Sequence, residues 1–295
     1  MNKRLRDFRS ALTSVPADAT HWTEVARDPN HPRAIAHRAQ KLNAAWLDPI
    51  PDRTQFILDR VLGRRVLDVG CVAHDIDRMT SAEWLHRRVA DAASACVGVD
   101  ILPEGVAHMR KLGFEAVVHD LSTGSGPLAE LSRFDVIVAG ELIEHVANLD
   151  MLFKAARELL TPEGELILTT PNPYAPQRVR AGQRGVCWEN TDHIMYAFPS
   201  GVAELADRNG LTLAEATTTR PKNRLPSTVR EPLKSLKRRI RGTIWIPAGI
   251  ATDGTLRPIR LREGRHVFHG RGRSARFVGE TFIYVVRRRP EPADG

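Results

Sequence analysis

Two glutamates and two histidines in the middle of the chain have the residue types and spacing for proton transfer. Glu141, Glu144 and His145 lie in the stretch GELIEHV, and His193 lies in NTDHIMYAF. If the first stretch turns helically, its residues at i, i+3 and i+4 share one face. We expect His145 to accept the proton because imidazole titrates near neutral pH, with Glu144 orienting or replacing it. His193 is the second candidate, and a structural hydrogen bond is the alternative role of each histidine.

A second group of candidates consists of acids that follow short apolar runs. Asp68 and Gly70 lie in RRVLDVGCVAHD, Asp100 ends CVGVD, and Asp120 lies in VVHDL. Open α/β sheets bind their ligands at the carboxyl ends of the strands, where these acids are expected. Gly70 allows the chain to turn against a ligand without a Cβ clash. The pattern therefore predicts a small-molecule site at this edge.

The loop after Gly70 indicates which ligand the site takes. A dinucleotide diphosphate needs further glycines for close backbone approach, and Val72 and His74 stand where they would be. A ligand without phosphates fits better, and S-adenosylmethionine is such a ligand. We expect Asp68 near its positive methionine end, Asp100 on the ribose hydroxyls and Asp120 on the adenine amino group.

Short apolar runs alternate with segments of helical periodicity, which places these residues on a recognisable framework. Strands that alternate with helices predict an α/β protein whose parallel sheet is covered on both faces. The predicted strands are 65–69, 96–99, 115–118, 134–140, 165–170, 211–219 and 281–289. The predicted parts are an N-terminal helical lid (1–52), a cofactor-binding core (53–222 and 277–290), a basic insertion (223–276) and a disordered tail (291–295).

Positive charge is concentrated near the C-terminal end of the chain. Residues 220–290 hold 19 Lys and Arg against 4 Asp and Glu, a balance of 19 − 4 = +15, whereas the whole chain carries +8. Such a field favours an anionic acceptor, nucleic acid or an acidic membrane, although a solvated basic surface is the plain alternative. Within the insertion, apolar residues of 225–240 recur at helical spacing among lysines and arginines. This amphipathic helix is expected to cap the domain in preference to lying on lipid.

Cysteine content and hydropathy indicate the compartment. The three cysteines, Cys71, Cys96 and Cys187, are too scattered for a disulfide framework. No stretch has the pattern of a signal peptide or the length of a membrane span. We expect a cytoplasmic protein, with peripheral contact at the inner membrane face as an open alternative.

Residues 64–219 resemble the class I S-adenosylmethionine-dependent methyltransferases, in particular the subgroup with the ubiquinone-pathway O-methyltransferases. The resemblance is carried by VLDVGC, CVGVDI, VVHDL, FDVIVAGELIEHVANLDMLFKAARELLTPEGELILTTPNPY and DHIMYAFPSGVAELADRNGL. It implies a Rossmann-like doubly wound sheet of seven strands, with the last strand antiparallel. Val72 and His74 depart from the family pattern, which usually has glycine or a small residue there. Ile101, Leu121 and Gly140 complete the expected cofactor site.

Three functions are compatible with this resemblance. The first is methyl transfer to an oxygen of a small-molecule, saccharide or lipid-linked metabolite. The second is metal-dependent RNA methylation, because small-RNA 2′-O-methyltransferases are similar in having a Glu-x-x-Glu-His run and a later histidine; Glu141, Glu144, His145 and His193 would then be metal ligands. The third is an inactive binding module. We favour the first without a metal, and the oligomeric state is left open.

Overall fold

A computed structural model describes residues 15–16, 19–187, 189–220, 277 and 279–289. The chain divides into two compact units. The first comprises Met1–Asn43 and Pro221–Arg276, and the second Ala44–Arg220 and Phe277–Gly295. The predicted basic insertion and disordered tail lie outside the described residues.

The described part of the first unit holds a short 3-10 helix, η1 (Trp22–Glu24), and most of α2 (Pro32–Ala45). His21 begins η1 with a capping box, in which its side chain accepts from the helix and Glu24 bonds back to the His21 backbone. Two side chains of α2 are tied to the preceding segment: Lys41 Nζ donates to Thr20 O at 2.8 Å, and His37 Nε2 lies 2.9 Å from Ala19 O. The lid function of this segment stays a prediction.

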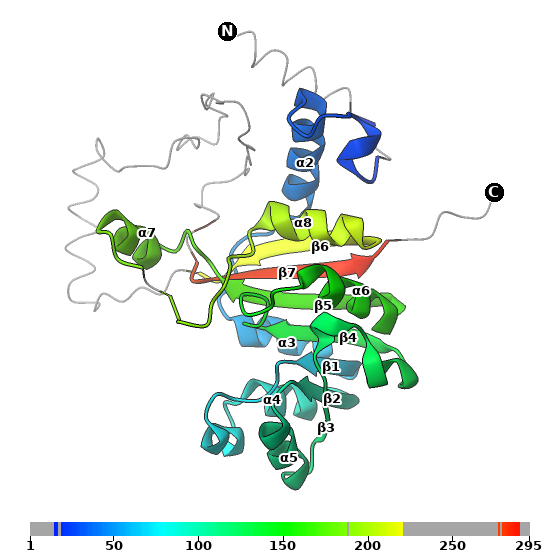
Figure 1. Cartoon of the computed structure of the whole chain (residues 1–295), viewed down its shortest axis with the longest axis vertical. Coiled ribbons are helices and arrows are strands. Elements are labelled where there is room, and N and C mark those ends of the chain that lie inside the picture. Colours follow the sequence, from blue (N-terminus) through cyan, green and yellow to red (C-terminus); the bar gives the residue numbers. More distant parts are fainter. Residues whose placement is uncertain (1–14, 17–18, 188, 221–276, 278, 290–295) are drawn as a thin grey trace. The chain divides into compact units, whose positions relative to one another are not determined.

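The second unit is built on a seven-stranded sheet in the order β3-β2-β1-β4-β5-β7-β6 (Figure 1). Strands β1 to β5 are parallel, and β7 lies antiparallel between β5 and β6. This confirms the predicted fold and the antiparallel last strand. The strands are β1 (Arg65–Val69), β2 (Ala95–Asp100), β3 (Glu115–Val118), β4 (Phe134–Gly140), β5 (Leu160–Pro171), β6 (Leu211–Thr218) and β7 (Thr281–Arg288).

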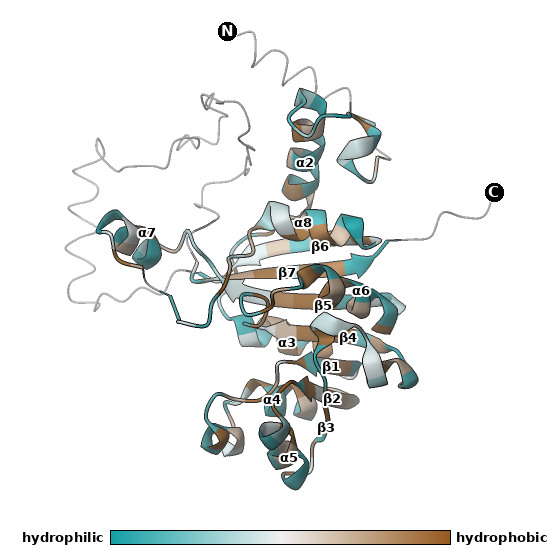
Figure 2. Ribbon diagram, in the orientation of Figure 1, coloured by the Kyte–Doolittle hydropathy of each residue, from teal (hydrophilic) through white to brown (hydrophobic). Residues whose placement is uncertain are grey.

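Helices cover both faces of the sheet. In Figure 1, α6 and α8 lie in front of the sheet and α3 lies behind it; α3 also contacts α4. The α-helices are α3 (Arg53–Val61), α4 (Leu85–Ala92), α5 (Pro103–Lys111), α6 (Leu149–Leu159), α7 (Pro176–Gln183) and α8 (Pro199–Arg208), and the 3-10 helices are η2 (Ile76–Thr80), η3 (Leu121–Thr123) and η4 (Gly126–Glu130). Figure 2 shows apolar residues concentrated along the strands and polar ones on the outer sides of the helices. This is the burial that a doubly covered sheet requires.

The edge of the sheet beyond β6 is extended by residues before α3. Trp46 forms a bridge with Ala216, within β6, and Ile50 forms one with Thr219, directly after β6. The Trp46 ring packs edge-on against Phe277 at a centroid distance of 4.8 Å. Residues 46–50, which the sequence places in the N-terminal segment, therefore pair with the core.

A buried glutamate joins three strands at the opposite end from the predicted ligand edge. Glu165, near the start of the regular part of β5, is contacted by Arg64 at 3.1 Å, Arg287 at 3.1 Å and Arg60 at 4.0 Å. Arg60 and Arg287 also reach Glu215 on β6, at 2.5 and 3.3 Å. Each arginine thus has a carboxylate partner, and the network links α3, β5, β6 and β7.

Candidate active site

The order of the strands reverses between β1 and β4, and the loops that follow these strands form the candidate site. Gly70, directly after β1, has φ 70°, a left-handed conformation that favours glycine. A Cβ added there would lie 2.8 Å from Leu142 Cδ1 in the loop after β4. The two loops therefore touch at Gly70, which explains why glycine stands at this position.

Val72 stands where a glycine-rich cofactor loop would have a glycine, and its side chain fits there because another glycine faces it. Gly105 of α5 has no side chain, and a Cβ built there would lie 2.4 Å from Val72 Cγ1. The valine side chain thus fills the space that Gly105 leaves open. The Val72 N–H donates to Asp100 Oδ2 at 2.9 Å. The backbone of the loop therefore contacts the end of β2 even though Val72 has a bulky side chain. His74, the other residue at an expected glycine position, is exposed.

Asp68 lies within β1 and not at its end, and it is 3% exposed. His86 of α4, 1% exposed, places Nδ1 2.8 Å from Asp68 Oδ2. The other ring nitrogen of His86 has no hydrogen-bond partner among the described residues. Sequence reasoning missed this pair because the two residues are 18 positions apart in no shared motif. Contact between Asp68 and a cofactor stays a prediction.

Asp100, at the end of β2, organises the loops around it. Its Oδ2 accepts from Val72 N–H and its Oδ1 accepts from Leu102 N–H at 3.1 Å. An ionised carboxylate has about four acceptor positions, so two remain for the hydroxyls of a ribose. Ile101 beside it is 63% exposed, which leaves an apolar side chain for an adenine to cover. These features fit an adenosyl group.

The remaining cofactor candidates lie at the ends of β3 and β4. Asp120 is exposed and caps η3, its Oδ1 accepting from Ser122 N–H at 2.8 Å, while Leu121 is buried. Gly140 ends β4, and a Cβ there would approach Leu85 of α4 at 3.1 Å. These positions border the same edge, and their contacts with a cofactor stay predictions.

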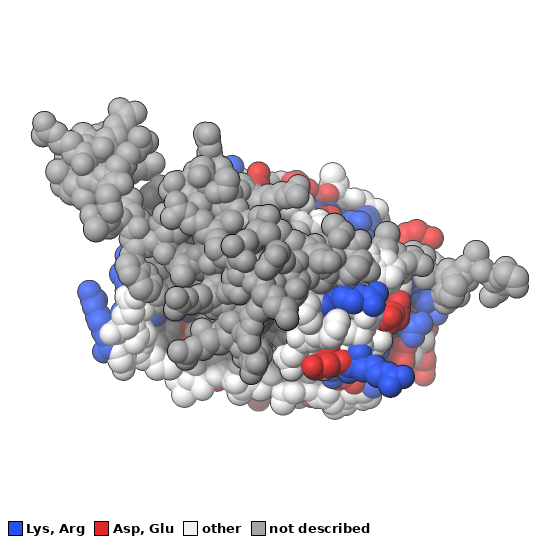
Figure 3. Space-filling model, turned by 90° about the horizontal axis from the view of Figure 1, so that it is seen from above, with Lys and Arg blue, Asp and Glu red and all other residues white. Residues whose placement is uncertain are grey.

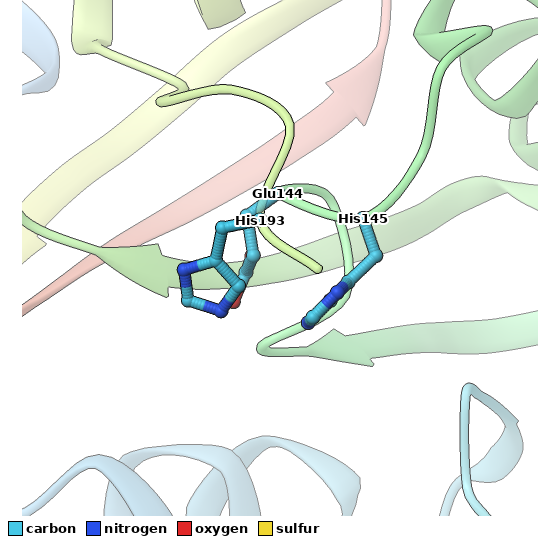
Figure 4. A group of neighbouring side chains, drawn as sticks. All are labelled: Glu144, His145 and His193. Atoms are coloured by element: carbon cyan, nitrogen blue, oxygen red, sulfur yellow. The ribbon is translucent and has the colours of Figure 1, made fainter. Parts of the chain in front are cut away.

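Glu144, His145 and His193 come together beyond β4, with their ligand-type atoms within 4.8 Å of one another. Figure 4 shows the tips of the three side chains pointing the same way, and the two imidazole ring centroids are 4.8 Å apart. The two segments are held by a backbone bond, Ile194 N–H to Glu144 O, at 2.9 Å. The structure thus brings together the three residues predicted for catalysis.

Glu141 does not join this cluster. Residues 141–145 form turns and not a helix, and Glu141 has the positive φ of 54°. Its carboxylate pairs with Arg53 at 3.1 Å and accepts from the Thr169 hydroxyl at 3.1 Å. The assumed helical turn was therefore wrong, because the backbone reverses at Glu141 and directs this side chain to α3 and β5.

Glu144 is 1% exposed, and neither carboxylate oxygen has a hydrogen-bond partner among the described residues. The buried Thr170 hydroxyl is likewise without a hydrogen-bond partner among the described residues, and it lies near enough to Glu144 to oppose part of the rise in the pKa of that carboxyl. Burial, reinforced by the nearby charge of Glu141, raises the pKa of Glu144 to about 7.

Each histidine of the cluster has a carboxylate on its Nδ1 side. His193 Nδ1 lies 2.7 Å from Glu189 Oε2, and His145 Nδ1 lies 3.3 Å from Asp192 Oδ2. Arg178 of α7 also binds Glu189. Burial opposes ionisation of Glu189, but hydrogen bonds from Arg178, Tyr196 and His193 hold its pKa below the ordinary value. Sequence reasoning missed both carboxylates, although the segment around His193 was singled out.

The described surface mixes both signs of charge. In Figure 3, Lys and Arg lie beside Asp and Glu on the coloured part of this face. The basic residues that suggested an RNA surface fall mostly in 221–276, outside the described residues, so that alternative stays a prediction.

None of the described helices has the length and apolar character that crossing a membrane requires.

Comparisons with known proteins identify a family and several relatives of this chain. Residues 35–216 match the family model described as "Methyltransferase domain". A ubiquinone biosynthesis O-methyltransferase of Cereibacter sphaeroides is 28% identical over 176 residues, which cover 56% of this chain and 67% of the relative. Another, from Aromatoleum aromaticum, is 23% identical and covers 69% of this chain and 86% of the relative. A solved S-adenosylmethionine dependent methyltransferase from Mesorhizobium loti is 15% identical, with a TM-score of 0.43 over 80% of this chain and 95% of that one.

Proposed function

Because residues 35–216 match its model, the chain belongs to the methyltransferase domain family, and we propose that it methylates an oxygen of a small-molecule, saccharide or lipid-linked metabolite. It is an enzyme that uses S-adenosylmethionine as its cofactor, as the sequence predicted. The oxygen specificity and the acceptor class are the proposed parts. The ubiquinone biosynthesis O-methyltransferases among its relatives support an oxygen acceptor.

One observation carries the proposal: a cluster of proton-accepting groups lies next to the loop that fits an adenosyl cofactor. Gly70 of the cofactor loop meets Leu142, and Glu144 and His145 follow two and three residues later. Methyl transfer needs donor and acceptor in line and the hydroxyl proton removed. The acceptor oxygen forms its bond to the methyl carbon as the carbon–sulfur bond breaks, and S-adenosylhomocysteine leaves.

The hydroxyl proton passes to the cluster in the simplest form of this reaction. His145 is the first candidate for the proton acceptor, with Glu144 orienting or replacing it and His193 as the second candidate. All three stand at the carboxyl side of β4, and Arg53 with Thr169 holds Glu141 away from them. The acceptor hydroxyl is therefore expected between the cluster and the cofactor loop.

Exposed apolar side chains favour an acceptor with an apolar portion. Several large ones occur in the segment between β5 and α8, which includes His193. These side chains are Tyr174, Val179, Val186, Ile194 and Phe198. A lipid-linked or aromatic acceptor would cover apolar side chains of this segment while presenting its hydroxyl to the cluster.

The cofactor part is tested by Asp100→Asn, which keeps the shape of the side chain and removes its charge. Hydrogen bonds to charged groups contribute about 1.5–3 kcal/mol, so we expect S-adenosylhomocysteine affinity to fall about 10- to 150-fold in titration calorimetry. Asp91→Asn, at an exposed position of α4, is the control. Unchanged affinity in Asp100→Asn would remove this residue from the cofactor site.

The acceptor part is tested with tritiated S-adenosylmethionine and a panel of matched hydroxyl and amine acceptors, including phenols with and without a prenyl chain. We expect label in the hydroxyl compounds, with the prenylated phenols preferred. Transfer confined to the amines would refute the oxygen assignment.

A further inference from the structure

A histidine and an aspartate form a buried hydrogen bond beside the cofactor loop. His86 of α4 is 1% exposed and Asp68 of β1 is 3% exposed, and Nδ1 of the histidine lies 2.8 Å from Oδ2 of the aspartate. An ionised carboxylate only accepts hydrogen bonds, so the imidazole donates this one from Nδ1. The side chain of Asp68 makes no other hydrogen bond among the described residues. Its second oxygen, Oδ1, is therefore left for a ligand.

The neighbouring residues leave room for the imidazole of His86 and hold it in place. Gly98 lies opposite Asp68 in the register of β1 and β2, and a Cβ built on it would lie 3.0 Å from Cε1 of His86. A glycine inside a strand weakens the strand, because it has no side chain to pack and loses more entropy on folding. The imidazole also packs against Trp84 and Phe114, at centroid distances of 5.0 and 5.1 Å. The ring therefore has little freedom to turn.

Stability alone does not require this polar pair. Val66 and Val138, which lie next to Asp68 on the same face of the sheet, and Val89, one turn after His86, belong to one buried apolar cluster. Apolar residues of similar volume in place of a buried ionic pair often leave stability unchanged or raise it. A pair retained in such surroundings is expected to serve a function, and Asp68 lies only two residues before the turn of the cofactor loop.

We propose that His86 is a positioning residue for the cofactor. Its Nδ1 proton fixes Oδ2 of Asp68, so that Oδ1 is presented to the ammonium group in the methionine part of S-adenosylmethionine. His86 is too deeply buried to touch the cofactor and acts through the carboxylate. Trp84, directly before α4, holds the same loop, since its Nε1 donates to Cys71 O at 3.0 Å. The inference concerns cofactor binding and does not depend on the acceptor proposed above.

The test compares two ligands that differ in the methionine part. S-adenosylhomocysteine has the ammonium group, and 5′-methylthioadenosine has the same adenosine and a thioether without it. In His86→Gln the amide lies at the position of Nε2 and the donor to Asp68 is lost. Because hydrogen bonds to charged groups are the stronger ones, we expect S-adenosylhomocysteine affinity to fall about 10-fold or more in titration calorimetry, with methylthioadenosine affinity nearly unchanged.

Two variants and one control complete the set. His86→Asn, whose amide can place a donor where Nδ1 was, should restore most of the S-adenosylhomocysteine affinity. Asp68→Asn should show the same selective loss as His86→Gln. His108→Gln on α5 is the matched control, because Nε2 of His108, like that of His86, is buried without a hydrogen-bond partner among the described residues. It should bind both ligands as the wild type does.

Circular dichroism reports whether each variant folds. An equal loss of both ligands in folded His86→Gln would show that the histidine only supports packing, and it would overturn the proposal. Unchanged S-adenosylhomocysteine affinity in folded His86→Gln or Asp68→Asn would do the same. If His86→Gln does not fold, proton NMR of the wild-type chain decides. The signal of the His86 Nδ1 proton should shift with S-adenosylhomocysteine and much less with methylthioadenosine, and equal or absent shifts would overturn the proposal.

These measurements need no methyl transfer. A chain that methylates amines only would refute the proposed oxygen acceptor and leave the role of His86 intact. Transfer to hydroxyls by a His86→Gln variant with wild-type cofactor affinity would have the opposite meaning.

Discussion

Replacing Gly105 by alanine tests whether Val72 takes its place in the cofactor loop because α5 leaves room for it. The added methyl carbon would lie 2.4 Å from Cγ1 and 2.8 Å from Cγ2 of Val72, inside the usual carbon–carbon contact of about 3.5–4.0 Å. Overpacking of this kind costs about 1–3 kcal/mol, whereas alanine gains about 1 kcal/mol over glycine in a helix. We expect the free energy of unfolding to fall by up to about 2 kcal/mol.

Combining this change with Val72→Ala removes both close contacts. Val72→Ala alone deletes two partly buried carbons and is expected to cost about 1 kcal/mol. In the double variant the nearest remaining contact is the Cβ of residue 72, at 3.2 Å. The helix then keeps its gain from alanine without the overpacking. We expect the double variant to exceed the sum of the single changes by about 1–3 kcal/mol in stability.

Urea unfolding followed by circular dichroism measures all four proteins of this cycle. Calorimetric titration with S-adenosylhomocysteine gives a second reading, since the Val72 N–H is bonded to Asp100. Gly105→Ala displaces this loop and should weaken binding, and adding Val72→Ala should restore part of it. Stabilities that add within about 0.5 kcal/mol would show that the two residues do not pack as described and would refute the explanation of the missing glycine.

Two further predictions concern the framework. Burial raises the pKa of the Cys71 and Cys96 thiols, whereas Cys187 is exposed. An aromatic disulfide reagent that reacts with thiolates at pH 8 is therefore expected to label Cys187 quickly, and Cys71 and Cys96 only after unfolding. The fast phase should be absent in Cys187→Ser. Glu165→Gln is expected to lower the free energy of unfolding by about 2 kcal/mol. Removing one partner of a fully buried ion pair typically costs about 3–5 kcal/mol, and the cost is smaller here because Arg287 is 47% exposed. The exposed Glu163→Gln on the same strand is the control, and equal stability of the two variants would contradict the structural role of the network.

The strands were predictable where apolar runs are continuous and bounded. Residues 134–140 were predicted as a strand and form β4 with those limits, because the run is apolar on both faces and ends at a turn. The strand predicted at 165–170 instead begins at Leu160. Its pairing with β4 shifts register between Phe134 and Val136. Backbone bonds around such an irregularity leave no side-chain pattern, so the sequence could not indicate them.

The site was predictable to the extent that strand ends determine it. Gly70, Asp100 and the group Glu144, His145 and His193 were identified from their types and positions, and the structure places them at one edge. Glu141 was misjudged because a reversal at positive φ cannot be read from helical spacing. The pair Asp68 and His86 depends on how α4 packs against β1, a contact that only the assembled sheet defines.

The position of β7 sets the order in which the sheet is completed during synthesis. Every bond between β5 and the β6 edge passes through residues 281–288, which are translated more than sixty positions after β6. While the chain is still emerging from the ribosome, β5 and β6 therefore have unpaired edges of the kind that other polypeptides add to. A nonsense codon after β6 and before Thr281 would leave both edges permanently open, so such truncated products are expected to aggregate.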